Sequence, residues 1–240
     1  MKNPFLTAVL ISLSFSTAVS AATVIYQDDF SGLATSNLNG TTPDVGANNW
    51  VASTDIKANG SALTSNERAA YLPFAPVAGF IYTATIGVDF VSSGSGTGSL
   101  QFAFANTSSI SVHPAGNSGG SGQLFIRQNG SGVSRSNHGT DILAQANGTY
   151  NLATPPIDVF TMTLNTTGSA WTYQGAINGT NVGNLFTYTT NPTITQIAFG
   201  GNGTGGGTGT FSNFSLTSVP EPSTGLLALL GGLFLLRRKR

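Results

Sequence analysis

Apolar and polar residues alternate along much of this chain, and this pattern limits its fold more than any other feature. Between Phe80 and Phe90 every second residue is apolar, and most residues in between are polar or glycine. A period of two places the apolar side chains on one face of an extended strand, as in a half-buried sheet. The alternation recurs in five further segments: Leu100–Phe104, Leu124–Ile126, Phe160–Leu164, Trp171–Tyr173 and Phe214–Leu216.

Turn signals separate these segments. Asn-Gly pairs, which favour tight turns between strands, occur at residues 39–40, 59–60, 129–130, 147–148, 178–179 and 202–203. Thr23–Phe30 is expected to form the first strand, and the best short helix candidate is Asp141–Ala146. Many short strands joined by glycine-rich turns predict an all-β fold, an antiparallel β-sandwich of the jelly-roll type.

The charges are distributed unevenly. The formal net charge of the whole chain is zero, but five of its nine basic residues lie at the two ends. Residues 23–218, which are predicted to form the folded domain, carry four basic and eight acidic residues, a net charge of −4. A mildly acidic domain lacks the basic surface that nucleic-acid binding requires. The chain has no cysteine, so disulfides, cysteine metal ligands and a cysteine nucleophile are excluded.

The first 22 residues have the pattern of a secretory signal. A short basic start, Met1-Lys2-Asn3, precedes the mostly apolar segment Phe5–Val19, and the small residues Ser20-Ala21-Ala22 follow. This order predicts a signal peptide over residues 1–22 that signal peptidase removes after Ala21 or Ala22. The rest of the chain is therefore expected to leave the cytoplasm.

Residues 219–240 combine three parts. Pro220, Glu221 and Pro222 come first, an apolar run over residues 225–236 follows, and Arg237, Arg238, Lys239 and Arg240 end the chain. Proline fixes φ and disfavours helix in the preceding residue, so the first part is expected to be extended. The run would span only about 18 Å as a transmembrane helix, against a hydrocarbon core of about 30 Å. The basic end would stay on the cytoplasmic side.

This arrangement resembles the PEP-CTERM sorting signal of Gram-negative bacteria, which has the same three parts in the same order. The resemblance implies that Pro220, Glu221 and Pro222 are recognised by an exosortase, a membrane-embedded cysteine transpeptidase that cleaves near the motif. Residues 225–236 would then tether the protein to the inner membrane only transiently. The released body would pass to the cell surface or to the extracellular matrix.

The predicted sandwich resembles the concanavalin and laminin-G-like domains in two places. The opening Asp28-Asp29-Phe30 is set against the closing segment Gly209–Leu216, as if the first and last strands were neighbours. The segment Trp171–Thr180 is similar to the strand and turn on which such domains display an aromatic residue. An aromatic ring offers a flat apolar platform with a polar edge, so Trp50, Trp171 and Tyr173 are candidates for stacking on sugar rings.

No catalytic residues are predicted. The segment Gly116–Gly120 fits the pattern G-x-S-x-G around Ser118, but only His113 and His138 could serve as a base. The alternating β and α elements that the α/β-hydrolase form of this pattern needs are absent. Glycosidases need two closely spaced carboxylates, and Glu67 is the only glutamate of the predicted domain. An exported hydrolase of polysaccharides or esters remains the alternative.

No motif requires a cofactor, although oxygen atoms at the strand ends could bind calcium. Asp28 and Asp29 would point to opposite faces of a strand, and one of them could share a calcium site with Asp89 or Asn213. The alternative is a strand end that is solvated and binds no ion, so no metal site is assigned.

Together these patterns predict a non-enzymatic protein that is exported to the surface or matrix. Its β-sandwich would contribute to biofilm or exopolysaccharide structure and could bind glycan. The expected partners are signal peptidase, exosortase, the membrane before cleavage and exopolysaccharide.

Overall fold

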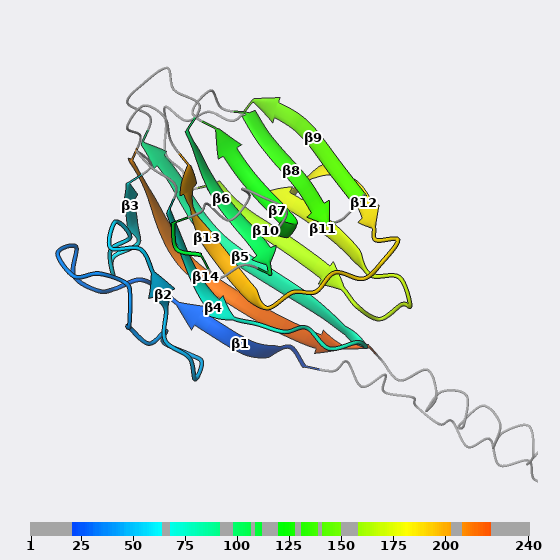
Figure 1. Cartoon of the computed structure of the whole chain (residues 1–240), viewed down its shortest axis with the longest axis horizontal. Coiled ribbons are helices and arrows are strands. Elements are labelled where there is room, and N and C mark those ends of the chain that lie inside the picture. The colour runs from blue at the N-terminus through cyan, green and yellow to red at the C-terminus, as the bar shows by residue number, and fades with distance from the viewer. Residues whose placement is uncertain are drawn as a thin grey trace, which may run out of the picture. The chain divides into compact units, whose positions relative to one another are not determined.

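Two antiparallel sheets pack face to face in the computed structural model of the chain (Figure 1). The structure describes residues 21–63, 68–91, 98–106, 109–111, 120–127, 131–138, 141–149, 158–202 and 208–221. Residues Ala22–Glu221 form one compact unit. The strands, the core and the candidate sites described below all belong to it.

The first sheet contains both the first and the last strand of the chain. Its order is β1 (Thr23–Asp28), β14 (Thr208–Pro220), β5 (Phe80–Val91), β10 (Asp158–Asn165), β11 (Thr172–Ile177) and β12 (Thr180–Thr187), and β3 (Ser61–Leu63) also pairs with β14. Every neighbouring pair is antiparallel, from Thr23 opposite Ser218 at one edge to Ile177 opposite Thr180 at the other. The prediction that the first and last strands are neighbours is confirmed.

The second sheet covers the inner face of the first. Its order is β2 (Val51–Ala52), β4 (Arg68–Pro73), β13 (Gln196–Asn202), β6 (Ser99–Ala105), β7 (Gly120–Arg127), β8 (Ser131–His138) and β9 (Asp141–Thr149). β13 and β14 follow each other in sequence but belong to different sheets. The predicted all-β antiparallel sandwich is therefore confirmed.

Alternate residues of both sheets form the core between them. In β5, Tyr82, Ala84, Ile86 and Val88 are buried, as the period of two predicts. An aromatic cluster fills one part of this core. The ring centroid of Trp50 lies 5.2 Å from that of Phe199 and 5.3 Å from that of Phe214, with the rings tilted steeply against each other. Such edge-to-face pairs contribute about 0.5–1.5 kcal/mol beyond their buried area.

Two local predictions are corrected by the strand pairing. Asp141–Ala146 is the first part of β9 and pairs with β8 instead of forming a helix. The Asn147-Gly148 pair, expected to form a turn, lies inside the same strand.

The Asn178-Gly179 turn is confirmed, because both residues have positive φ, 51° and 75°, and join β11 to β12. These values suit the two-residue turn that matches strand twist.

The outer face of the second sheet is buried, unlike a solvated sheet face. Gln101, Ala103, Gln123 and Ala198 are each at most 3% exposed and alternate with core residues. Both side-chain amide atoms of Gln123 are buried and lack a hydrogen-bond partner within the described part of the chain. An unpaired buried amide is unfavourable by about 1–3 kcal/mol.

The predicted targeting segments lie outside the described residues. These are most of the signal peptide (1–20), Pro222, the apolar run 225–236 and the basic end from Arg237 to Arg240. Among the described residues, no helix is long and apolar enough to cross a membrane.

Candidate functional site

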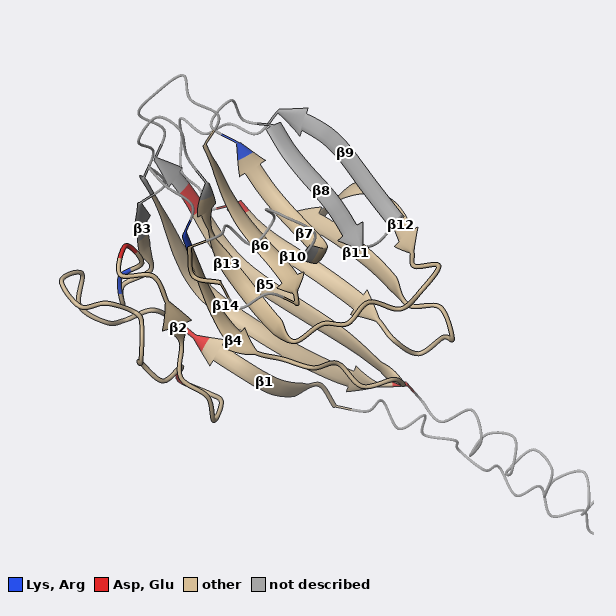
Figure 2. Cartoon of the chain, in the orientation of Figure 1, with Lys and Arg blue, Asp and Glu red and all other residues tan. Residues whose placement is uncertain are grey.

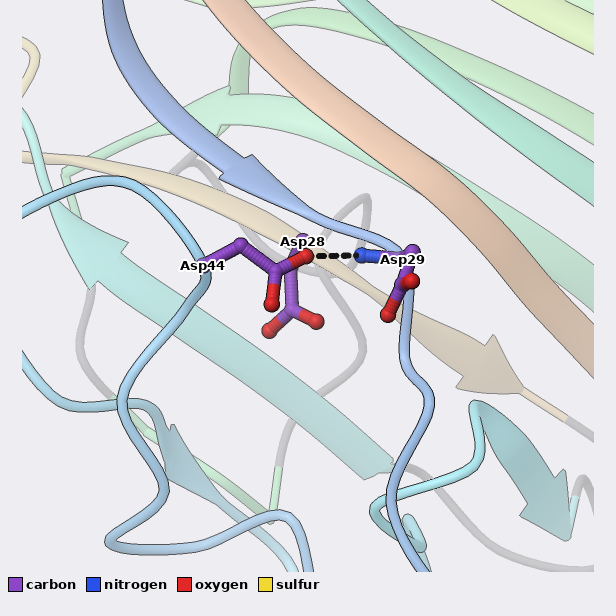
Figure 3. Close-up of side chains that lie close together, drawn as sticks. All are labelled: Asp28, Asp29 and Asp44. Carbon is purple, nitrogen blue, oxygen red and sulfur yellow. Dashed lines mark hydrogen bonds between the residues drawn. The ribbon is translucent and has the colours of Figure 1, made fainter.

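Three carboxylates gather where β1 ends (Figure 3). Asp28 is the last residue of β1, Asp29 follows it, and Asp44 comes from the loop before β2; one oxygen of each lies within 4.8 Å of the others. The Asp29 amide donates a hydrogen bond of 2.9 Å to Asp44 Oδ2. Two backbone hydrogen bonds of 3.0 Å between Gln27 and Val45 bring the Asp44 loop beside β1. We call these three residues the acidic cluster.

Asp28 points into the sandwich, and its surroundings differ from those of the other two acids. It is 7% exposed; its Oδ2 accepts a 2.6 Å hydrogen bond from Trp50 Nε1, and its Oδ1 accepts one of 2.8 Å from the Phe30 amide. Burial raises the pKa of Asp28 above its usual value, and the charges of Asp44 and Asp29 raise it further. The two donated hydrogen bonds lower the pKa but do not outweigh the burial.

An open pocket of about 300 Å³ lies beside the acidic cluster. It is lined by Gln27, Asp28, Asp29, Asn213, Phe214 and Ser215. Asn213 belongs to a bulge of β14, where the register with β5 shifts between Ser212 and Ser215. Its φ of 50° is one that asparagine adopts more readily than most residues. The bulge therefore brings an amide side chain to the end of β1.

The sequence predicted this grouping only in part. The sequence offered two partners for Asp28 or Asp29 in a calcium site, Asp89 and Asn213. Asn213 lines the same pocket as Asp28 and Asp29. Asp89, the other alternative, pairs with Thr210 and is not among the lining residues. Asp28 and Asp29 do not lie on opposite faces of one strand, because β1 ends between them. Asp44 was missed, since no sequence pattern connects its loop to β1.

The acidic cluster offers oxygen ligands of the kind that calcium prefers. Calcium takes about six to eight oxygens, which carboxylates, amides and backbone carbonyls can supply. One of the three carboxylates is buried, however, and already accepts hydrogen bonds from Trp50 and Phe30. The other two, Asp29 and Asp44, are exposed. The cluster thus combines one structural carboxylate with two that are accessible to solvent.

The three aromatic candidates differ in accessibility. Trp50 and Tyr173 are each 1% exposed, and the Tyr173 hydroxyl donates a 2.8 Å hydrogen bond to the carbonyl oxygen of Gln123. Their predicted role in sugar stacking is corrected, because both rings are used in the core. Trp171 is half-buried against the core, just before β11. It is the one member of the three with exposed surface.

Hydroxyl groups form two rows across the outer face of the first sheet. Three neighbouring strands each carry two of them, separated by one buried residue: Ser215 and Thr217 on β14, Thr83 and Thr85 on β5, Thr161 and Thr163 on β10. The register places Thr217 opposite Thr83 and Thr83 opposite Thr163 in one row. Ser215, Thr85 and Thr161 make the other row. We call these six residues the hydroxyl face.

The hydroxyl face is regular, partly exposed and uncharged. All six residues are of intermediate exposure. Neighbouring strands lie about 4.8 Å apart, and residues two positions apart along a strand are about 6.7 Å apart. Charged residues are found mainly at strand ends and in loops, and the middle of the first sheet has none among the described residues (Figure 2). Each hydroxyl can donate one hydrogen bond and accept others.

The hydrolase alternative has no support from the described acids. In the acidic cluster, Asp28 is buried and its carboxylate already accepts hydrogen bonds from Trp50 and Phe30. Glycosidases need two carboxyl groups that both reach the bond that is cleaved. Glu67, His113 and Ser118 lie outside the described residues, and only the backbone of His138 is described, in β8.

The final residues match a known sorting signal. Residues 218–240 match the family described as the PEP-CTERM protein-sorting motif. The chain ends in a PEP-CTERM sorting motif. This motif implies export, processing by an exosortase, and a cell-surface or extracellular location. No curated protein matched the chain in a sequence comparison.

Solved structures resemble the sandwich at low sequence identity. The endo-1,3-β-glucanase of Streptomyces sioyaensis has a TM-score of 0.55 and 16% identity, covering 87% of this chain and 100% of that chain. The metal-free carbohydrate recognition domain of Emp46p has a TM-score of 0.46 and 12% identity, over 70% of this chain and 87% of that one. Sheep galectin-11 has a TM-score of 0.40 and 12% identity, over 62% and 96%. The first of these matches establishes a shared β-sandwich fold.

Proposed function

We propose that this protein is a non-enzymatic component of the cell surface or extracellular matrix that binds neutral exopolysaccharide through its hydroxyl face. Signal peptidase would remove residues 1–22, and the apolar run 225–236 would hold the chain in the inner membrane until an exosortase acts at Pro220, Glu221 and Pro222. The observation that supports export is the sorting motif at residues 218–240. The hydroxyl face supports the binding role.

The chemistry of the hydroxyl face suits a neutral glycan. Its hydroxyls can accept hydrogen bonds from sugar hydroxyls, and those other than Thr217, which already donates to the carbonyl oxygen of Thr83, can also donate to them. The threonine methyl groups can contact sugar C–H groups. Its rows repeat at intervals of about 4.8 and 6.7 Å, so several bonds can form along one extended polymer. No charge on the rows attracts or repels a partner, which favours a neutral polymer over a strongly acidic one.

Co-sedimentation with polysaccharide from the producing organism would test this proposal. The processed protein would be mixed with neutral and acidic polysaccharide fractions, with and without a calcium chelator. We expect retention by the neutral fraction and no effect of the chelator, because the six residues of the hydroxyl face bind through hydroxyls, although one of them, Ser215, also lines the pocket beside the acidic cluster. Failure to bind any fraction would leave a purely structural role.

A charge placed in the centre of the hydroxyl face gives the sharper test. Thr85 lies between Ser215 and Thr161 in its row, so Thr85→Arg should weaken retention at least tenfold. Leu33→Arg is the matched control, since Leu33 is 71% exposed and distant in sequence from these strands. Equal binding by the two variants would exclude the hydroxyl face as the binding surface.

A further inference from the structure

The last strand of the sandwich runs into the sorting motif without a linker. Pro220 is the final residue of β14 and lies opposite Phe80 on β5. The Glu221 amide then donates a 2.9 Å hydrogen bond to the carbonyl oxygen of Gly79. Two of the three residues of the Pro-Glu-Pro motif are therefore held against the turn before β5.

The start of the domain lies beside the same part of β14. Thr23 is opposite Ser218, so β14 has β1 on one side and β5 on the other up to Ser218. Ser218 is 7% exposed and Leu216 is completely buried. From Val219 onward only β5 and its turn pair with the strand, and Glu221 is exposed. Hydrogen bonding to the sheet thus extends into the motif as far as Glu221.

This pairing restricts where a processing enzyme can bind. Enzymes that cleave peptides commonly bind an extended segment whose backbone groups are free to pair with the enzyme. A bond at or before Ser218 could be reached only by separating β14 from β1 and β5 and exposing Leu216. Bonds between Val219 and Glu221 would require the pairing with Ile81, Phe80 and Gly79 to open.

We propose that the folded sandwich is the substrate of the transpeptidase, and that the bond broken lies C-terminal to Glu221. The inference rests on the proposed processing by an exosortase, but not on glycan binding. The enzyme's thiolate would attack the carbonyl carbon of this peptide bond and form a thioester. The C–N bond then breaks, and the amino group of the released tail takes up a proton. Water or an amine acceptor then resolves the thioester, leaving a carboxylate or a new amide on the body.

The C-terminal residue of the mature protein tests the position of the bond. The protein would be recovered from producing cells, and its intact mass and C-terminal peptide would be measured. We expect a chain that ends at Glu221 or later and lacks residues 225–240. A chain ending at Pro220 or earlier, or one that keeps residues 225–240, would overturn the proposal. Neither result bears on polysaccharide retention, which is measured separately.

An insertion tests whether the sheet sets this limit. Gly-Ser-Gly-Ser placed after Ser218 separates the intact motif from Gly79 and Phe80, and the same insertion after Leu33 is the control. If the sheet protects Val219–Glu221, products ending before Glu221 should appear only with the first insertion. If both variants gave the same product as the natural protein, the motif alone would determine the position of the cleaved bond. That result would overturn the role of the sheet.

Discussion

Asp28 and Gln123 are both buried polar side chains, but they differ in what surrounds them. Asp28, 7% exposed at the end of β1, accepts hydrogen bonds from Trp50 and Phe30. Gln123, fully buried on the outer face of the second sheet, has no partner for either amide atom in the described structure. The difference shows that burial alone does not indicate the role of a polar residue. The Asp28 side chain connects a loop to the core, whereas the side-chain amide of Gln123 has no hydrogen-bond partner among the described residues.

Removing the Asp28 carboxylate should produce the largest effect. Asp28→Ala leaves Trp50 Nε1 and the Phe30 amide without an acceptor, at about 1–3 kcal/mol for each group. We therefore expect the free energy of unfolding to fall by about 2–6 kcal/mol, measured by urea denaturation. Asp29→Ala is the control, because Asp29 is exposed and its loss should change stability by less than about 1 kcal/mol. Equal losses would contradict the structural role of Asp28.

The pH dependence of stability sharpens the contrast further. The pKa of Asp28 is raised in the folded state, so its contribution to stability is complete at pH values below its unfolded pKa of about 3.8. This contribution is lost as the pH rises through the folded pKa, where the buried carboxyl must ionise. Asp28→Asn cannot ionise at this position. The stability of the Asn variant relative to the natural protein should therefore rise from pH 3 to pH 7, and a constant difference would contradict this.

Replacing Gln123 should have the opposite sign. Gln123→Met keeps an unbranched side chain of similar size but removes two buried polar groups that have no hydrogen-bond partner among the described residues. We expect the free energy of unfolding to rise by about 1–2 kcal/mol, measured by urea denaturation. Gln174→Met on the first sheet is the control: Gln174 is half-buried, and its Nε2 donates to the carbonyl oxygen of Gly175. That variant should lose up to about 1 kcal/mol, and a loss of stability in Gln123→Met would mean that its amide is paired.

The smallest effect is expected on the hydroxyl face. Thr163 is partly exposed, and valine has nearly the same shape and a similar preference for strands. Thr163→Val should therefore change the free energy of unfolding by less than about 0.5 kcal/mol, measured by the same denaturation. A larger loss would show that the hydroxyl row itself stabilises the sheet.

The alternation of apolar and polar residues predicted those strands well that have one buried face and one partly exposed face. Phe80–Phe90 was expected as a strand, and β5 covers Phe80–Val91. The period of two identifies a buried face but not the sheet or the neighbour, so the order of β13 and β14 in different sheets could not be predicted. Asp141–Ala146 has residues compatible with a helix, and its pairing with β8 overrode this local preference.

The candidate sites were less predictable, for physical reasons. Asp44 reaches the acidic cluster through the backbone pairing of its loop with Gln27, which leaves no trace in the sequence. Trp50 lies outside any alternating segment, so nothing indicated that its ring is buried beside Asp28. The hydroxyl face depends on the register of three strands that are distant in sequence. By contrast, the sorting motif is local, and the family match confirmed it.

The position of β14 between β1 and β5 also determines how the sandwich would respond to mechanical load. A body attached through its C-terminus and pulled by bound polymer would be loaded along β14. The ladder hydrogen bonds lie roughly perpendicular to the strands, so this force would shear both ladders together instead of opening one bond at a time. Two ladders would share that load: a longer one with β5 from Thr208 to Pro220, interrupted by the bulge between Ser212 and Ser215, and a shorter one with β1 from Phe214 to Ser218.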